Sequence, residues 1–361
     1  MPQIAESGLT PLAALNPASD LQMHLGRITP RIFTGTESEF AALVHAAAVY
    51  DLGYLTRIRI TGEDRVRWLN GMVTNTVQAL PQGYGNYTLI LNAQGRIQGD
   101  GYVFRDSGHL LFETDRVQAP RLLAHLDHFI IMDDVELQEL DATTTTLGLA
   151  GPQAPAILNA LGLPVPEPLA FASATLREIP LTIVRSYDVR VPRFQLWIAA
   201  EYTAEVWRIL TEAGAKRAGF QALECLRILE GTPRYGVDFS DRYLPQEVNQ
   251  SRALNFNKGC YLGQEIVERI RSRATVHRTL RQFELTGDLP SAGAELRAEA
   301  SPDPNDDKPI GEITSAAHYA LPGLTRNFAL GMVRVEALER KSTITYPGGR
   351  AIPLDAPPAL P

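Results

Sequence analysis

The stretch Lys258-Gly259-Cys260-Tyr261-Leu262-Gly263-Gln264-Glu265 places a cation, a thiol, a phenol, an amide and a carboxylate around two glycines. Apolar residues at helical spacing follow it, from Ile266 to Ile270, and predict a helix that begins directly after the stretch. Cys260 would then lie just ahead of a helix N-terminus and two residues from Lys258, and both positive influences favour a thiolate. The stretch therefore predicts a reactive cysteine. The competing interpretation is a turn before a helix, with Cys260 packed beneath it.

The octapeptide resembles the signature of the YgfZ-type folate-binding proteins, which are relatives of the aminomethyltransferase (T protein) of the glycine cleavage system. In that family the string K-G-C-Y-x-G-Q-E is the diagnostic motif, and each of its fixed positions is met here. Further stretches resemble family landmarks, in family order, over roughly residues 50 to 340. They are Asp64-Arg65, the Asn92–Asp100 hairpin, Leu149–Pro152, Leu226-Arg227, Gly231–Gly236 and Pro309–Ser315.

The hydrophobic pattern along the chain predicts alternating strands and helices, followed by an all-β region. Helices are expected over 37–49, 117–129, 154–161, 203–213 and 220–230, and strands over 55–61, 110–113, 147–152, 181–185 and 194–199. A hairpin turn is expected at Asn92–Gly95, and Gly231 is placed to cap the helix before it. Residues 279–361 form short strand-like segments separated by Gly, Pro and Asp, with a charged loop at Pro302–Pro309 and a helix only at 335–340.

The resemblance implies a more definite architecture than this pattern. The expected fold class is α+β: a ring-like arrangement of two α/β folate-binding units with a C-terminal antiparallel β-barrel domain, and reduced folate in the central opening. We expect a loose N-terminal lead over 1–23, a T-protein-like folate-binding region over 24–278 and the barrel over 279–361. The folate-binding region would consist of two units, about 24–143 and 144–278.

Composition narrows the class of protein. With 361 residues, 45% of them apolar and 21% charged, the chain is expected to form a globular protein of two or three domains. A net charge of −7 argues against nucleic-acid or anionic-membrane partners, and no apolar run is long enough to span a bilayer. The first twenty residues carry no Lys or Arg, so we expect no secretion signal and a cytoplasmic location.

The chain has two cysteines, Cys225 and Cys260. This count indicates a reducing compartment without a disulfide framework. Because an iron–sulfur cluster commonly takes four thiolates, one chain cannot hold a cluster by cysteine alone. The seven histidines show no metal-ligand spacing, so no bound metal or cluster is expected. Cys225, on an apolar-periodic helix, is expected to be a core residue.

Asp100 lies between two glycines where a hairpin strand leaves its turn. Aspartate is a poor strand former, and the residue pattern by itself favours a turn role. In the T-protein family an aspartate at the matching position faces the reduced folate. The resemblance therefore implies that Asp100 contacts the ligand and, with Cys260 and Lys258, is a candidate catalytic residue.

The family's second pterin contact is a glutamate in an Arg-x-Glu pattern on the helix before the glycine. Here the pattern reads Arg227-Ile228-Leu229-Glu230, so Leu229 takes the expected position. One place on a helix is about 100° of rotation, which moves the carboxylate to another face. The sequence leaves three alternatives: Glu230 with a reset helix end, Glu247 as the acid, or a different mode of pterin recognition.

Residues around the motif complete the expected folate contacts. The resemblance extends them to Asn92 in the hairpin and to Tyr261, Gln264 and Glu265 in the motif. A basic run begins at Arg269 and Arg271 and continues to Arg281. Such a run is commonly a solvated face, but its position favours capture of the folate glutamate tail. Nucleic-acid contact is the weaker alternative, because aromatic residues do not interleave with the arginines.

Three functions remain at this stage. The resemblance favours a tetrahydrofolate-binding accessory protein, or one using another reduced folate, that supports assembly or repair of iron–sulfur client proteins. The second is a folate-dependent aminomethyltransferase or other one-carbon transferase. The third is a binding module in which Cys260 senses redox state without folate. The motif argues for the first over the second, because T proteins do not carry this cysteine octapeptide.

Overall fold

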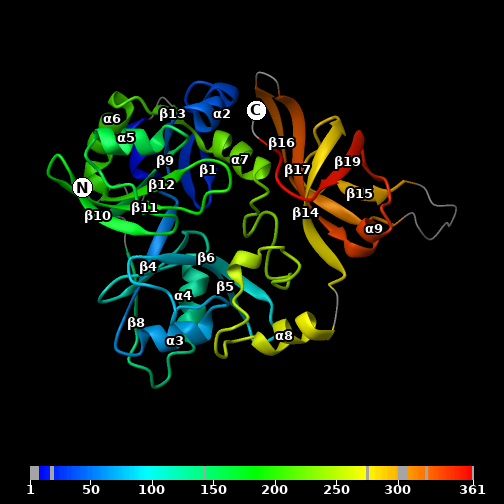
Figure 1. Cartoon of the computed structure of the whole chain (residues 1–361), viewed down its shortest axis with the longest axis horizontal. Coiled ribbons are helices and arrows are strands. Elements are labelled where there is room, and N and C mark those ends of the chain that lie inside the picture. The colour runs from blue at the N-terminus through cyan, green and yellow to red at the C-terminus, as the bar shows by residue number, and fades with distance from the viewer. Residues whose placement is uncertain are drawn as a thin grey trace. The chain divides into compact units, whose positions relative to one another are not determined.

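The protein consists of two compact units (Figure 1). The computed structural model describes residues 8–16, 20–140, 143–273, 276–299, 308–321 and 324–359. The first unit holds the chain up to Thr88, together with Asp100–Leu223 and Asn255–Gly259. The second unit holds Leu89–Gly99, Glu224–Leu254 and the chain from Cys260 onward. The motif stretch is thus divided between the units after Gly259.

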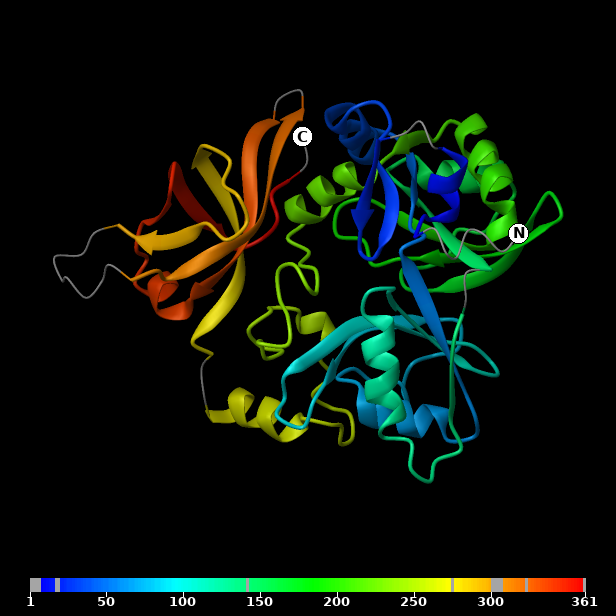
Figure 2. The ribbon, with the colours of Figure 1, turned by 180° about the vertical axis from the view of Figure 1, so that it is seen from behind.

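One five-stranded sheet contains the hairpin that carries Asp100. Its strands, in spatial order, are β5 (Gly85–Leu91), β6 (Ile97–Arg105), β7 (Leu110–Asp115), β4 (Leu55–Thr61) and β8 (Glu136–Glu139). Helix α3 (Arg65–Met72) follows β4, and α4 (Ala119–Asp127) lies against β4 and β8 (Figure 2). The predicted strand over 55–61 and the predicted hairpin turn at Asn92–Gly95 are confirmed.

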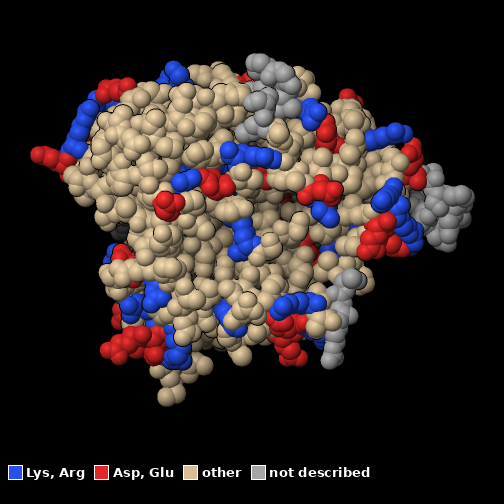
Figure 3. Space-filling view, in the orientation of Figure 1, with Lys and Arg blue, Asp and Glu red and all other residues tan. Residues whose placement is uncertain are grey.

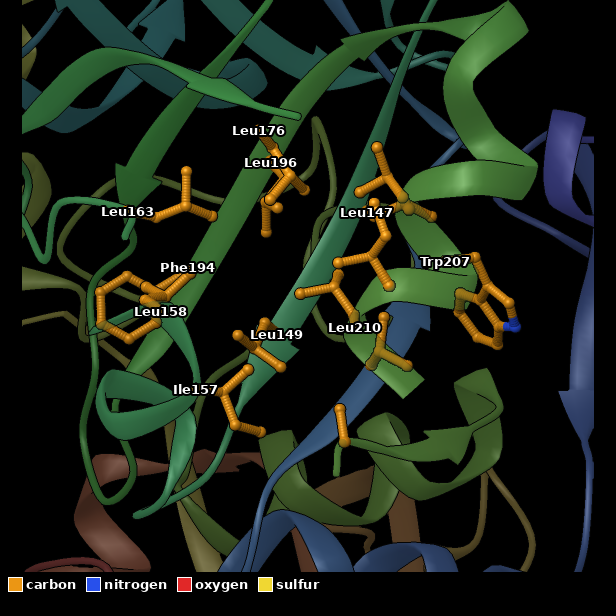
Figure 4. Packing of buried hydrophobic residues seen from close by; sticks show 14 of the residues in the cluster. Leu147, Leu149, Ile157, Leu158, Leu163, Leu176, Phe194, Leu196, Trp207 and Leu210 are labelled. Atoms are coloured by element: carbon orange, nitrogen blue, oxygen red, sulfur yellow. The ribbon is translucent and has the colours of Figure 1, made fainter. Parts of the chain in front are cut away.

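A six-stranded sheet forms the second layer of the first unit. Its spatial order is β10 (Phe171–Leu176), β11 (Ile179–Arg185), β12 (Arg193–Ala199), β9 (Thr144–Ala150), β3 (Ala48–Asp51) and β13 (Lys216–Ala218). The helices that precede or follow these strands in the sequence are α2 (Thr36–His45), α5 (Ala154–Ala160), η1 (Ala200–Tyr202) and α6 (Thr203–Glu212). Leucines of β9 and β12 pack with α5 and with Trp207 of α6 in the core that Figure 4 shows.

Strand β3 differs from the sequence prediction, which expected a helix over 37–49. Helix α2 ends at His45, and Ala48 and Val49 begin a strand between β9 and β13. All four residues of β3 are buried. A short, fully buried strand shows no alternation of polar and apolar residues, so periodicity cannot separate it from the end of an alanine-rich helix.

The second unit contains a closed barrel. Its order is β14 (Arg278–Gly287), β17 (Leu324–Arg334), β16 (Gly311–Leu321), β15 (Glu295–Ala298), β18 (Ile344–Tyr346) and β19 (Gly349–Leu354), with every pair antiparallel. Phe283, Leu296, Ile313 and Val333 fill its core. The helices that precede or follow the barrel strands in the sequence are α7 (Phe220–Leu229), η2 (Ser251–Ala253), α8 (Gln264–Arg273) and α9 (Val335–Glu339).

The predicted fold class is confirmed: α/β layers are followed by an antiparallel C-terminal β-barrel. The charged loop expected at Pro302–Pro309 lies largely outside the described residues. Among those residues, no helix is long and apolar enough to cross a membrane.

Part of the segment expected as a loose lead is ordered. Residues Pro11–Leu15 form α1, and Leu12 is only 1% exposed. Thr10 caps this helix by accepting a hydrogen bond from the Ala13 N–H, and its hydroxyl donates to the buried carboxylate of Asp51 at the end of β3. Asp51 also accepts from the Gly53 N–H at 2.8 Å. Burial raises the pKa of Asp51 to about 6.

This raised pKa predicts a pH dependence of stability. The folded state holds the Asp51 proton more tightly than the unfolded chain, so the stabilisation is complete below the ordinary pKa near 4 and is lost as pH rises through about 6. We expect Asp51→Asn to reduce the gain in unfolding free energy between pH 7.5 and pH 4.5 by up to about 3 kcal/mol. Urea unfolding at the two pH values measures it, with exposed Asp127→Asn as the control. Equal pH dependence in both variants would contradict this role.

Candidate functional site

Lys258 begins the motif, and its ammonium group is bound by backbone carbonyls of the first unit. Nζ donates to the carbonyl oxygens of Asn70 at 2.5 Å, Val73 at 2.5 Å and Asn75 at 2.9 Å. These oxygens lie at the end of α3 and in the segment after it. Burial lowers the pKa of Lys258 to about 7, while the three acceptors favour the charged form. The lysine therefore anchors residues 255–259 to the α3 end.

The second half of the motif folds as a tight turn onto helix α8. The Tyr261 N–H donates to Gln264 Oε1 at 3.2 Å, and the Gln264 N–H donates back to the Tyr261 carbonyl at 3.1 Å. Tyr261 is buried, and burial raises its pKa to about 12. Glu265 is exposed in the first turn of α8, where a carboxylate suits the positive end of the helix.

Gly263 explains why the motif requires glycine beside the hairpin. Its φ is +80°, and a Cβ there would lie 2.5 Å from the Asn92 carbonyl oxygen and 3.1 Å from the Gly95 Cα. The Asn92 side chain holds that hairpin turn itself, because its Oδ1 accepts from the N–H groups of Gln94 and Arg96. The structure thus brings Asn92 and the motif glycine into direct contact within the second unit. Only a residue without a Cβ permits this approach.

The two cysteines lie in opposite environments. Cys260 is exposed, whereas Cys225 is buried on α7. Burial and nearby Glu224 raise the pKa of Cys225 to about 12. The predicted core role of Cys225 agrees with this placement, and Cys260 is the thiol that a reagent in solution can reach.

Asp100 is held by two side chains that sequence reasoning did not identify. Tyr87 donates its phenol hydroxyl to Asp100 Oδ2 at 2.6 Å, and Gln118 donates Nε2 to Oδ1 at 2.9 Å. The Asp100 N–H donates to Gln118 Oε1 at 3.1 Å, so the Gln118 side-chain amide binds both the backbone and the carboxylate of Asp100. Tyr87 and Gln118 are both 6% exposed and Asp100 is half-buried. The carboxylate therefore has a fixed orientation.

The glycine after Asp100 is fixed by packing. A Cβ on Gly101 would lie 2.4 Å from the Glu113 carbonyl oxygen on the neighbouring strand. The polar residue Tyr87 on the adjacent strand is a signal that a sequence search for cross-strand partners of Asp100 could have used. Gln118 precedes α4 and carries no such signal.

The acids considered for pterin recognition are buried in the second unit. Leu229 is fully buried and Glu230 is 3% exposed. Helix α7 ends beside them as predicted, with Gly231 at φ +66° and the Gln282 amide donating to the Ile228 and Leu229 carbonyls. Glu247 is engaged elsewhere: it accepts from Arg278 Nε at 2.9 Å and from the Leu244 N–H at 2.8 Å.

The basic run is partly neutralised by acids of the same unit. Arg271 lies 3.5 Å from Glu268, and Arg278 pairs with Glu247 over the Tyr243 ring. Arg269 is exposed on α8. Figure 3 shows acidic and basic side chains interspersed over the displayed face rather than gathered into one positive surface. No cluster of three metal-ligating side chains occurs among the described residues.

Comparison with known proteins identifies the family. A family model described as the GCVT N-terminal domain matches residues 19–258, so the chain belongs to this family. It is 27% identical over 334 residues to an aminomethyltransferase of Thermus thermophilus, covering 91% of this chain and 90% of that protein. An aminomethyltransferase of Thermoanaerobacter pseudethanolicus is 24% identical over 318 residues, covering 85% and 84%.

A solved structure shares the fold. The glycine cleavage system aminomethyltransferase T of Bartonella henselae superposes with a TM-score of 0.83 at 19% identity, covering 95% of each chain. At this identity the likeness establishes the fold class.

The carbonyl contacts of Lys258 predict a structural role that can be measured. Lys258→Met leaves three carbonyl oxygens without their charged donor, and we expect the free energy of unfolding to fall by about 1–3 kcal/mol. Urea unfolding of Lys258→Met and of the exposed control Lys216→Met provides the comparison. The control is expected within about 0.5 kcal/mol of wild type. A similarly small change in Lys258→Met would rule out the anchoring role.

Proposed function

We propose that this protein is a tetrahydrofolate-binding accessory protein of YgfZ type, which supports assembly or repair of iron–sulfur enzymes and uses Cys260 as its reactive thiol. Membership of the GCVT family supports the folate-binding part of the proposal. The observation that carries it is the orientation of Asp100 by Tyr87 and Gln118. A carboxylate whose direction is fixed before the ligand arrives gains specificity at little entropic cost.

The residues around Asp100 suit the polar end of a reduced pterin. Tyr87 and Gln118 each donate one hydrogen bond to the carboxylate, which fixes its orientation. A carboxylate with two lone pairs on each oxygen can also accept from ring N–H and amino groups of a ligand. Reduced folate supplies ring nitrogens that carry one-carbon units. The chain's contribution would be to bind and orient these nitrogens through Asp100.

The exposed thiol supports the accessory role. In the sequence, Cys260 lies between the segment that Lys258 anchors and the turn built on Gly263, and its side chain is exposed. Because the Lys258 ammonium is engaged with carbonyls, activation of Cys260 would rely more on the N-terminus of α8 than on the lysine. The iron–sulfur clients rest on the resemblance of the octapeptide to the YgfZ signature.

A one-carbon transferase is the second candidate function. It is favoured by the relatives named aminomethyltransferase, which match most of this chain. Against it stands Leu229, which fills the position of the family's pterin-contact glutamate and is fully buried. The buried carboxylate nearest in sequence is Glu230. Replacement of Glu230 therefore tests whether this region still recognises pterin.

Equilibrium binding of tetrahydrofolate under anaerobic conditions tests the proposal. We expect wild type to bind and Asp100→Asn to bind about tenfold more weakly, because the variant loses a charge-assisted hydrogen bond. Asp127→Asn, an exposed acid on α4, is the matched control and should bind as wild type does. Binding weakened by Glu230→Gln would extend the site to α7. Absence of binding in wild type would remove folate, and the redox-sensing module would then be the favoured function.

The reactivity of Cys260 gives a separate prediction. We expect iodoacetamide at pH 7 to alkylate folded wild type several-fold faster than a synthetic peptide carrying the same octapeptide, since the peptide lacks the helix N-terminus. The reaction should disappear in Cys260→Ser, because Cys225 is buried and its pKa is about 12. Equal rates for protein and peptide would show an ordinary thiol.

A further inference from the structure

A second concave site lies between the two sheets of the first unit. It is an open groove of about 590 Å³, lined by β4, β7 and Leu140 from the five-stranded sheet and the segment after it, and by residues of β9, β10, β11 and β12 from the six-stranded sheet. This volume falls in the range of small-molecule sites, about 300–1,000 Å³. Asp100, Cys260 and Lys258 are not among its lining residues. The groove is therefore separate from the proposed folate contacts.

Arg57 and Trp197, which line the groove, belong to a buried polar cluster that joins the two sheets. Arg57 of β4 donates to Thr146 of β9 at 2.8 Å, and its guanidinium carbon lies 4.5 Å from the centre of the Trp197 ring. Its NH1 also lies 3.6 Å from Glu113 Oε2, and Gln195 donates to the other oxygen of Glu113 at 2.8 Å. The charge of Arg57 is thus balanced by Glu113.

The charge of Arg59, unlike that of Arg57, is not paired with an acidic side chain among the described residues. Arg59 lies two residues along β4 on the same strand face as Arg57, and it is exposed. Its guanidinium makes no hydrogen bond or ion pair with any residue that the structure describes. Among the described residues that line the groove none is acidic, although acids outnumber bases in the chain. The described part of the groove lining therefore carries an unbalanced positive charge at the Arg59 guanidinium, which has five N–H donors.

The remaining lining is apolar with a hydroxyl rim. Leu111, Leu140 and Trp197 line the groove, as do hydroxyl-bearing Ser173 and Thr182. Apolar surface next to a single unbalanced cation matches a ligand with an apolar body and an anionic head. Guanidinium recognises planar or tetrahedral oxyanions through paired hydrogen bonds.

We propose that this groove binds a small organic anion, with its carboxylate, sulfonate or phosphate head on Arg59 and its apolar body against Leu111, Leu140 and Trp197. The proposal does not depend on the proposed folate function, because the groove shares no lining residue with Asp100 or the motif.

A matched pair of fluorescent probes tests the proposal. 8-Anilinonaphthalene-1-sulfonate carries the anionic head, and N-phenyl-1-naphthylamine has the same apolar body without it. We expect wild type to bind the sulfonate at least about tenfold more tightly than the neutral amine, and Arg59→Met to abolish this preference. Arg59→Lys should keep part of it, because it retains charge but not the guanidinium geometry.

Three control variants show where on the protein the probes bind. Arg208→Met removes an exposed arginine that pairs with Glu212 on α6, and it should leave both affinities unchanged. Asp100→Asn should also leave them unchanged, which separates this groove from the folate contacts. Ser173→Phe adds a ring on the groove face of β10 and should weaken the binding of both probes. Unfolding midpoints confirm that the variants fold.

Three results would overturn the proposal. One is an unchanged preference for the sulfonate in Arg59→Met, which would place the anion elsewhere. Another is equal affinity of wild type for the two probes, which would leave an apolar groove without anion recognition. A third contrary result would be that Asp100→Asn loses probe binding while Ser173→Phe binds as wild type does. That result would assign the probe to the folate contacts and would also reject the groove.

Discussion

The buried pairing of Arg57 with Glu113 is the interaction on which the first unit depends. Each α/β sheet has one face covered by helices, and the opposite faces meet around Phe104, Leu111, Val184 and Trp197. At the end of that contact Arg57 reaches across from one sheet to Thr146 and Trp197 of the other, and Gln195 reaches back to Glu113. Burial raises the pKa of Glu113 and lowers that of Arg57, so each group needs the other to remain charged. Removal of either partner would leave a buried charge, at a cost of about 3–5 kcal/mol.

In the second unit, a buried pair of arginine and aspartate side chains likewise joins separate elements at the barrel. Arg227 of α7 is 6% exposed and donates to Asp238 at 2.7 Å and to Ser315 of β16 at 2.9 Å. Asp238 in turn accepts from Thr314 and Ser315. A helix, an irregular segment and a barrel strand are thereby joined through one guanidinium. Polar joints of this kind fix geometry more strictly than apolar contacts, because hydrogen bonds require direction as well as proximity.

Sequence reasoning identified the elements with strong local signals. Strand β4, the hairpin at Asn92 and the cap at Gly231 follow from alternation and turn residues, which act over a few positions. It missed β3, whose burial on both faces removes alternation. It also missed Tyr87 and Gln118, because the hydrogen bonds that orient Asp100 depend on strand pairing and on where α4 begins. The carbonyl contacts of Lys258 were equally hidden, since a lysine two residues before a cysteine gives no sign of which atoms its ammonium contacts. The groove at Arg59 requires two sheets to be packed before it exists.

The position of β3 also constrains how the chain folds. Ala48 pairs with Ala150 on one side and with Lys216 on the other, so its partners are synthesised long after it. Until then β3, whose four residues are all buried in the finished sheet, has both edges unpaired, which is the condition that favours association with other chains. Each pairing closes a loop of a hundred residues or more, and such non-local contacts slow folding. The edges of β3 are therefore covered only when the six-stranded sheet is complete, after residues 216–218 have been synthesised.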